Sequence, residues 1–154
     1  MPLAVIVQRM LTYFLSIILL FSGFVKIVNP ASLIDALMQE LAFLPSNSLL
    51  DFLTISIASI LPVFEIGLGL LLIFSIHHNL IKAKRKQILT AVVILFSLFF
   101  LYSLYGFWAG GKSDCGCFGN VFNSSFGWGM LVRNLIFLCG SISIFFLEKK
   151  KNLS

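Results

Sequence analysis

Two cysteines, Cys115 and Cys117, stand two residues apart in the segment Asp114-Cys115-Gly116-Cys117-Phe118-Gly119. In an extended chain, residues two apart have Cα atoms about 6.6–7.2 Å apart, at or beyond the upper limit for a disulfide. A sharp turn is therefore needed to join the two sulfur atoms, and Gly116 permits it. A ring this small is expected to be strained, and strained disulfides exchange readily with other thiols. The spacing predicts a redox pair rather than a structural crosslink.

Three charged residues, Lys26, Glu65 and Arg133, stand inside long apolar runs. Charged side chains within a membrane are costly and generally face the interior of a helix bundle. One hypothesis is that Glu65 pairs with Lys26 or Arg133 and holds the helices together. The other is that the basic residues favour a thiolate at the cysteine pair or orient a polar quinone head group, and that Glu65 handles protons.

Small residues accompany two of these charges. Pro62, Glu65 and Gly69 share one face of the second span at three- and four-residue spacing, and Arg133, Phe137 and Gly140 share one face of the fourth. Small residues at such positions let two helices approach closely in a membrane. The sequence therefore predicts close helix packing at Glu65 and at Arg133.

The composition predicts an integral membrane protein. Hydrophobic residues make up 59% of the 154 residues and charged residues only 11%, whereas soluble domains average about 25% charged. The net charge of +5 is distributed at the ends of the apolar runs, so membrane lipid is the expected partner and nucleic acid is not. Residues 1–154 are expected to form a single membrane domain.

The apolar runs predict an all-α fold with four transmembrane helices, at about 10–28, 53–76, 88–108 and 127–147. Between the first two spans, apolar residues recur at helical spacing from Ala31 to Leu44, with polar residues between them. This stretch is too short to cross a bilayer. We therefore expect a short amphipathic helix lying in the membrane interface.

The basic residues predict the orientation of the chain, because Lys and Arg are retained on the cytoplasmic side. They gather between the second and third spans, at Lys82, Lys84, Arg85 and Lys86, and in the tail after residue 148. The connection at residues 109–126 holds only Lys112. Both termini are therefore expected to be cytoplasmic and the thiol turn periplasmic, in a bacterial inner membrane.

Neighbouring residues receive minor roles in this interpretation. Phe118 is expected to pack the turn against the membrane surface, and Gly119 to let the backbone leave it. His77 and His78 are expected to be solvated loop residues on the opposite face of the membrane, so no metal site is predicted. Cys139 lies within the fourth span and is expected to be a buried packing residue.

These residues resemble the MauE/DoxX family of redox-associated membrane proteins. The resemblance rests on four motifs in this sequence: Ser22-Gly23-Phe24-Val25-Lys26, Asn29-Pro30, Leu61-Pro62-Val63-Phe64-Glu65 with Gly67 and Gly69, and Cys115-Gly116-Cys117-Phe118-Gly119. It implies a four-helix membrane bundle broadly like the disulfide-generating DsbB and vitamin K epoxide reductase proteins. It also implies a quinone as electron acceptor and a thioredoxin-like or other cysteine-containing periplasmic partner.

Two features depart from that pattern. Asn120 stands where many relatives carry an acidic residue, and the chain offers one close cysteine pair where DsbB-like enzymes relay electrons between two. Cys115 and Cys117 must therefore exchange with both the partner and the acceptor, or another protein must supply the second pair. The sequence favours a membrane thiol–disulfide oxidoreductase. The alternatives are a non-enzymatic scaffold with a static disulfide and a small transporter lined by Glu65 and Arg133.

Overall fold

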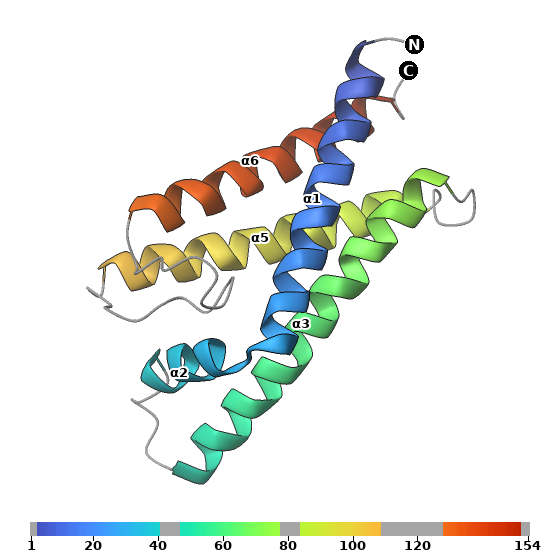
Figure 1. The fold of residues 1–154 in the computed structure, drawn as a ribbon. Coiled ribbons are helices and arrows are strands. Elements are labelled where there is room, and N and C mark those ends of the chain that lie inside the picture. The colour runs from blue at the N-terminus through green and yellow to red at the C-terminus, as the bar shows by residue number, and fades with distance from the viewer. Residues whose placement is uncertain (1–2, 41–46, 78–83, 109–127, 152–154) are drawn as a thin grey trace.

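The computed structural model describes residues 3–40, 47–77, 84–108 and 128–151, and these form five helices (Figure 1). In chain order the helices are α1 (Leu3–Val28), α2 (Ala31–Glu40), α3 (Asn47–His77), α5 (Arg85–Trp108) and α6 (Trp128–Lys151). All but α2 are long and apolar enough to cross a membrane. The all-α fold with four spans is confirmed.

The helices extend beyond the predicted spans at several ends. α1 begins at Leu3, whereas the first span was predicted to begin at residue 10. Gln8 is buried in the bundle and Arg9 is exposed on the helix surface, so neither polar residue interrupts the helix. α6 continues through its charged end to Lys151. Polar residues mark the end of the apolar stretch but leave backbone hydrogen bonding intact, so a helix can continue through them.

The short helix α2 begins at Ala31 as predicted and is described as far as Glu40. The predicted remainder, to Leu44, lies outside the described residues. Leu33 is buried and Ile34 and Leu37 are half-buried, whereas Asp35 is exposed. One side of α2 therefore packs on the bundle, mainly against α3.

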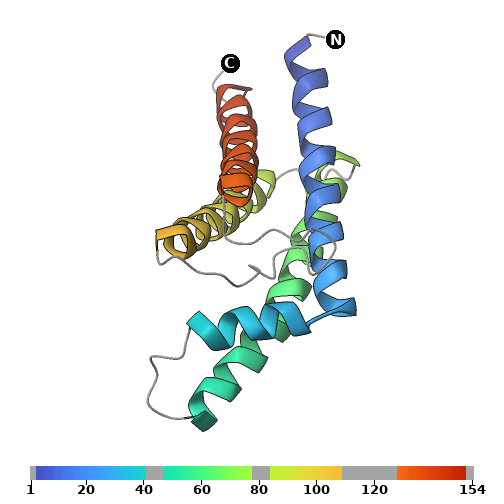
Figure 2. The ribbon, with the colours of Figure 1, turned by 60° about the vertical axis from the view of Figure 1, so that its left-hand side comes forward.

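The four long helices form two pairs. α1 lies beside α3 and α5 lies beside α6, and α1 also contacts α6 (Figures 1 and 2). α1 begins and α6 ends at the same end of the bundle, while α2 runs across the far end of α1 (Figure 2). The end of α5 and the start of α6 flank residues 109–127.

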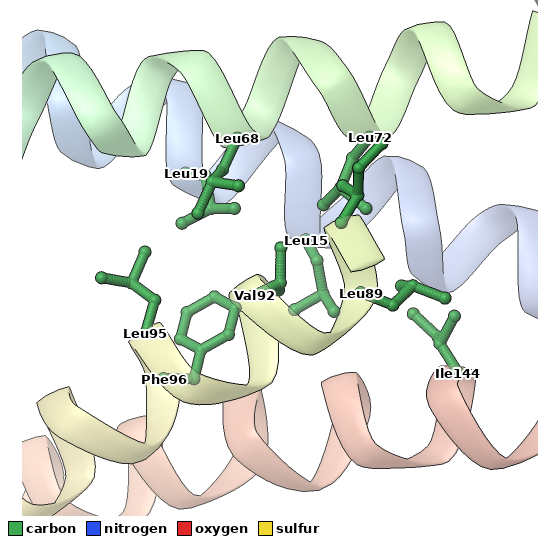
Figure 3. Close-up of a cluster of buried hydrophobic side chains, with 10 residues drawn as sticks. Leu15, Leu19, Leu68, Leu72, Leu89, Val92, Leu95, Phe96 and Ile144 are labelled. Carbon is green, nitrogen blue, oxygen red and sulfur yellow. The ribbon is translucent and has the colours of Figure 1, made fainter. Parts of the chain in front are cut away.

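A buried apolar core joins the two pairs (Figure 3). Leu15 and Leu19 on α1 and Leu68 and Leu72 on α3 face side chains from the second pair. The residues contributed by α5 and α6 are Ile88, Leu89, Val92, Leu95, Phe96 and Ile144. Large apolar side chains also cover the outside of the helices, as lipid contact requires.

Glycines let α1 and α3 approach closely, as the spacing around Glu65 predicts. A Cβ atom at Gly23 would lie 2.8 Å from the Pro62 carbonyl oxygen and 2.7 Å from a side-chain carbon of Ile66. At Gly69, an added Cβ would lie 3.1 Å from the Ser16 carbonyl oxygen. Pro62 itself stands inside α3, which continues through it.

Replacing Gly23 by Ala is expected to destabilise the protein by about 1–3 kcal/mol, because the new methyl group meets backbone that cannot move aside. Gly67→Ala is the matched control, since nothing lies within 4 Å of an added Cβ there. The measurement is unfolding in mixed micelles by increasing SDS, followed by circular dichroism. Equal stability of the two variants would contradict the close α1–α3 contact.

Candidate functional site

The thiol turn, Cys115, Gly116, Cys117, Phe118 and Gly119, lies outside the described residues. The structure describes the helix ends that flank it. The rings of Phe107 at the end of α5 and Trp128 at the start of α6 have centroids 5.3 Å apart and meet edge to face. The connection that carries the cysteines therefore leaves and re-enters the bundle at neighbouring points.

The clearest polar feature inside the bundle is a buried ion pair between α1 and α3. The Lys26 ammonium binds Glu65 Oε1, and the two side chains are 1% and 0% exposed. Lys26 Nζ also donates a hydrogen bond to Ser22 Oγ at 3.1 Å. The prediction that Glu65 pairs with Lys26 or Arg133 is confirmed for Lys26.

Local structure explains why the pair forms here. Ser22 and Lys26 are one helical turn apart, so both side chains lie on the same face of α1. Gly23 lies between them and brings α3 close, with the Glu65 Cβ only 3.3 Å from where a Gly23 Cβ would stand. Lys26 also belongs to the last turn of α1, where the helix dipole favours a positive charge.

A third helix contributes to the surroundings of Lys26. Its Nζ lies 4.9 Å from the centroid of the Phe99 ring on α5, within the range of a cation–π interaction. The Asn134 side chain on α6 donates a hydrogen bond to the Phe99 carbonyl oxygen at 3.4 Å. Residues from all four long helices therefore lie at or next to the ion pair, and Arg133 is half-buried beside Asn134.

A cavity of about 150 Å³ adjoins Lys26. Its other lining residues are apolar or aromatic and come from α2, α3 and α5: Leu33, Leu37, Leu61, Leu98, Phe99 and Tyr102. Among the described residues that line it, Lys26 alone is charged. The cavity therefore combines an apolar wall with a single cationic hydrogen-bond donor.

A second polar cluster stands at the opposite end of the bundle, where α1 begins and α6 ends. Glu148 Oε2 accepts a hydrogen bond from Gln8 Nε2 at 2.5 Å and lies 3.3 Å from Arg85 Nε. Arg85 Nη2 also donates to Thr12 Oγ1 at 3.5 Å. The cluster ties α1, α5 and α6 together.

This cluster corrects the sequence-based role of Arg85, which was expected to contact lipid together with Lys82, Lys84 and Lys86. Arg85 is only 7% exposed, whereas Lys84 and Lys86 are exposed. A run of basic residues gives no signal that one of them points inward. The acidic residue Glu148, which follows the last apolar run, is the feature of the sequence that could have suggested a partner for Arg85.

Two further expectations also differ from the structure. His77 ends α3 and its Nε2 lies 2.6 Å from the Tyr13 hydroxyl, so it is not simply a solvated loop residue. The Cys139 thiol is exposed on α6 rather than buried in the bundle. Its helical position fits a lipid-facing side chain, which composition alone cannot distinguish from a core position.

Comparison with known proteins gives one match. A family model described as "Methylamine utilisation protein MauE" matches residues 3–147, which include α1, α2, α3, α5, all but the last residues of α6, the Lys26–Glu65 pair and the thiol turn. No curated protein and no solved structure shows significant similarity to the chain.

Removing one member of the Lys26–Glu65 pair is expected to destabilise the protein by about 3–5 kcal/mol, because the other charge stays buried without its partner. The double change Lys26→Met with Glu65→Leu removes both charges and keeps similar volume, so it is expected to cost less than either single change. SDS-induced unfolding of the three variants measures these differences. A double variant as unstable as the sum of the singles would contradict a coupled pair.

Arg85→Gln is expected to cost about 1–3 kcal/mol, since Glu148 loses its ion-pair partner and Thr12 loses a hydrogen-bond donor in the bundle. Lys86→Gln removes the same charge from an exposed neighbour and should leave stability within about 0.5 kcal/mol of the parent chain. The same unfolding assay compares the two. Similar losses of stability in the two variants would mean that Arg85 acts only at the membrane surface.

Proposed function

The chain belongs to the MauE family of membrane proteins, and from this premise we propose that it is a thiol–disulfide redox protein of the bacterial inner membrane. In this proposal Cys115 and Cys117 exchange electrons between a periplasmic protein and a membrane acceptor. Both termini are cytoplasmic and the thiol turn faces the periplasm, as the distribution of basic residues favours.

The observation that carries the proposal is the Cys115-Gly116-Cys117 segment itself, set in the connection between two neighbouring helix ends. Two thiols separated by one glycine can close only a small ring. Such a ring suits exchange with another protein better than it suits stapling a membrane bundle, which its helices already hold together. An oxidising compartment outside the inner membrane gives such a pair a redox role.

The chemistry in the oxidising direction proceeds in two exchanges. A thiolate of the partner attacks one sulfur of the Cys115–Cys117 disulfide, which forms a mixed disulfide and releases the other cysteine. The partner's second thiolate then attacks the partner's own sulfur in the mixed disulfide. This step releases the cysteine of the chain, and the partner leaves with a disulfide of its own. Cys115 and Cys117 thereby gain two electrons and two protons, and a quinone that takes them becomes a quinol.

The partner proposed here is a thioredoxin-like or other cysteine-containing periplasmic protein. The chain has one close cysteine pair, since its remaining cysteine, Cys139, is on the exposed face of a transmembrane helix. A relay with two pairs therefore needs the second pair from the partner. The family description names methylamine utilisation, which we propose as one context for this exchange.

One observation favours a second candidate, a membrane scaffold with a static disulfide. Lys26 and Glu65 form a buried ion pair between α1 and α3, and such a pair can hold the helices together without a part in any chemistry. The same burial weakens the transporter alternative, which needs Glu65 to line a passage. The scaffold and the redox protein differ in what the cysteines do, and that difference can be measured.

Changing Cys115 or Cys117 singly to Ser is expected to trap a disulfide-linked complex with a periplasmic protein, because the resolving thiol is missing in one of the two variants. Non-reducing electrophoresis of membranes from growing cells detects the adduct, which disappears on reduction. Cys139→Ser is the control and should leave the adduct pattern unchanged. A membrane-impermeant maleimide applied to intact spheroplasts after reduction should label the Cys115/Cys117 pair.

Cysteines that stay reduced in cells and form no adduct in either variant would refute the redox proposal. A fully oxidised pair that never exchanges, together with normal function of the double Ser variant, would instead support the scaffold. Labelling only after lysis would reverse the proposed orientation.

A further inference from the structure

The cavity beside Lys26 has the dimensions of a small ring. Its volume of about 150 Å³ is that of an apolar protein cavity known to take up benzene. Phe99 and Tyr102 supply aromatic surface, and leucines supply most of the remainder. A flat six-membered ring therefore fits this space better than a polar or bulky solute.

Two of the described lining residues carry a polar group, Lys26 with its ammonium and Tyr102 with its phenolic hydroxyl, and Lys26 supplies the charge. A lysine ammonium has three N–H donors. Lys26 directs donors to Ser22 and Glu65, which leaves donor capacity for a ligand in the adjoining cavity. A ring that carries a hydrogen-bond acceptor would therefore be held in one orientation.

The charge of the site determines which kind of hydrogen-bond acceptor a ligand can present to Lys26. Glu65 already neutralises Lys26 within the bundle, so an anionic ligand would bring an uncompensated negative charge into an apolar space. A neutral carbonyl oxygen accepts the same hydrogen bond without that cost. The site therefore favours a neutral, carbonyl-bearing ring.

The cavity also reaches the lipid-facing surface. Leu98 lines it and is 58% exposed on the outside of α5. On the other side Leu33 and Leu37 come from α2, the short helix that does not cross the membrane. A ring with an apolar tail could enter from the bilayer, with the tail left among lipid.

We propose that this cavity is a quinone head-group site, with Lys26 donating to a quinone carbonyl oxygen and Phe99 and Tyr102 lining the ring. The role of that quinone as electron acceptor for Cys115 and Cys117 rests on the proposed function, whereas its binding does not. Lys26 is thus a ligand-positioning residue as well as a member of the structural pair.

The test uses the full chain purified in lipid nanodiscs, a photoreactive azido-quinone, and mass spectrometry of the crosslinked peptides. Crosslinks are expected on α2 near Leu37 and on α5 near Tyr102. Decylubiquinone should compete for them, and decylbenzene, which has no carbonyl group, should compete at least about tenfold less well.

Matched variants separate the cavity from the rest of the surface. Leu37→Trp fills the cavity and should lower crosslinking at least about tenfold. Met38→Trp adds the same side chain at the next position of α2, which does not line the cavity, and should leave crosslinking unchanged. The double variant Lys26→Met with Glu65→Leu should bind decylubiquinone and decylbenzene alike.

Equal competition by decylbenzene in the parent chain, or labels spread over the lipid-facing sides of the helices, would overturn the proposal. The double Cys115→Ser, Cys117→Ser variant should retain crosslinking, since binding does not need the thiols. Crosslinking with inert cysteines would therefore refute the proposed function alone. Exchanging cysteines without specific crosslinking would refute the quinone site alone.

Discussion

The buried contact between Lys26 and Glu65 constrains the rest of this structure. A lone charge inside a membrane is costly, so each side chain requires the other at close range. That requirement fixes the register of α1 against α3, and Gly23 is needed because any side chain there would push the two helices apart. The contact is also what gives the bundle its asymmetry. Polar groups gather near the end of α1, an apolar core fills the middle, and a second charged cluster around Glu148 closes the opposite end.

The fold could be predicted from the sequence because the membrane simplifies the problem. An apolar run of about 20 residues must be helical, since lipid offers no partner for backbone polar groups. Helix ends were less predictable, and α1 begins well before the predicted residue 10. Gln8 looks like the end of a span when only its polarity is considered. In the structure its amide meets Glu148, a residue at the other end of the chain, and that contact cannot be read from local sequence.

Only part of the candidate site could be predicted in the same way. Lys26 and Glu65 were recognisable because charges within apolar runs are rare, and the pairing followed from the need to neutralise them. Phe99 and Tyr102 gave no such signal, because aromatic residues are abundant in these spans and many of them are exposed on the outside of the helices. Arg85 was misinterpreted for a related reason. Arg85 is the residue of the basic run whose side chain points into the bundle. The rotation of α5 relative to Glu148 on α6 decides which basic residue takes that position.

The arrangement also bears on how one cysteine pair could serve a membrane acceptor. An enzyme with two pairs can move electrons by exchange between disulfides, and its acceptor site can then lie far from the thiols that meet the protein partner. A chain with a single close pair has no such relay, so its acceptor must approach that pair directly or another protein must carry the electrons. The cavity beside Lys26 lies close to the ends of α1 and α2, with α5 continuing from Phe99 to Trp108 before the connection that carries the cysteines. A lipid-soluble acceptor held there would lie toward the end of the bundle at which α5 ends and α6 begins, which is the placement that the proposed single-pair mechanism requires.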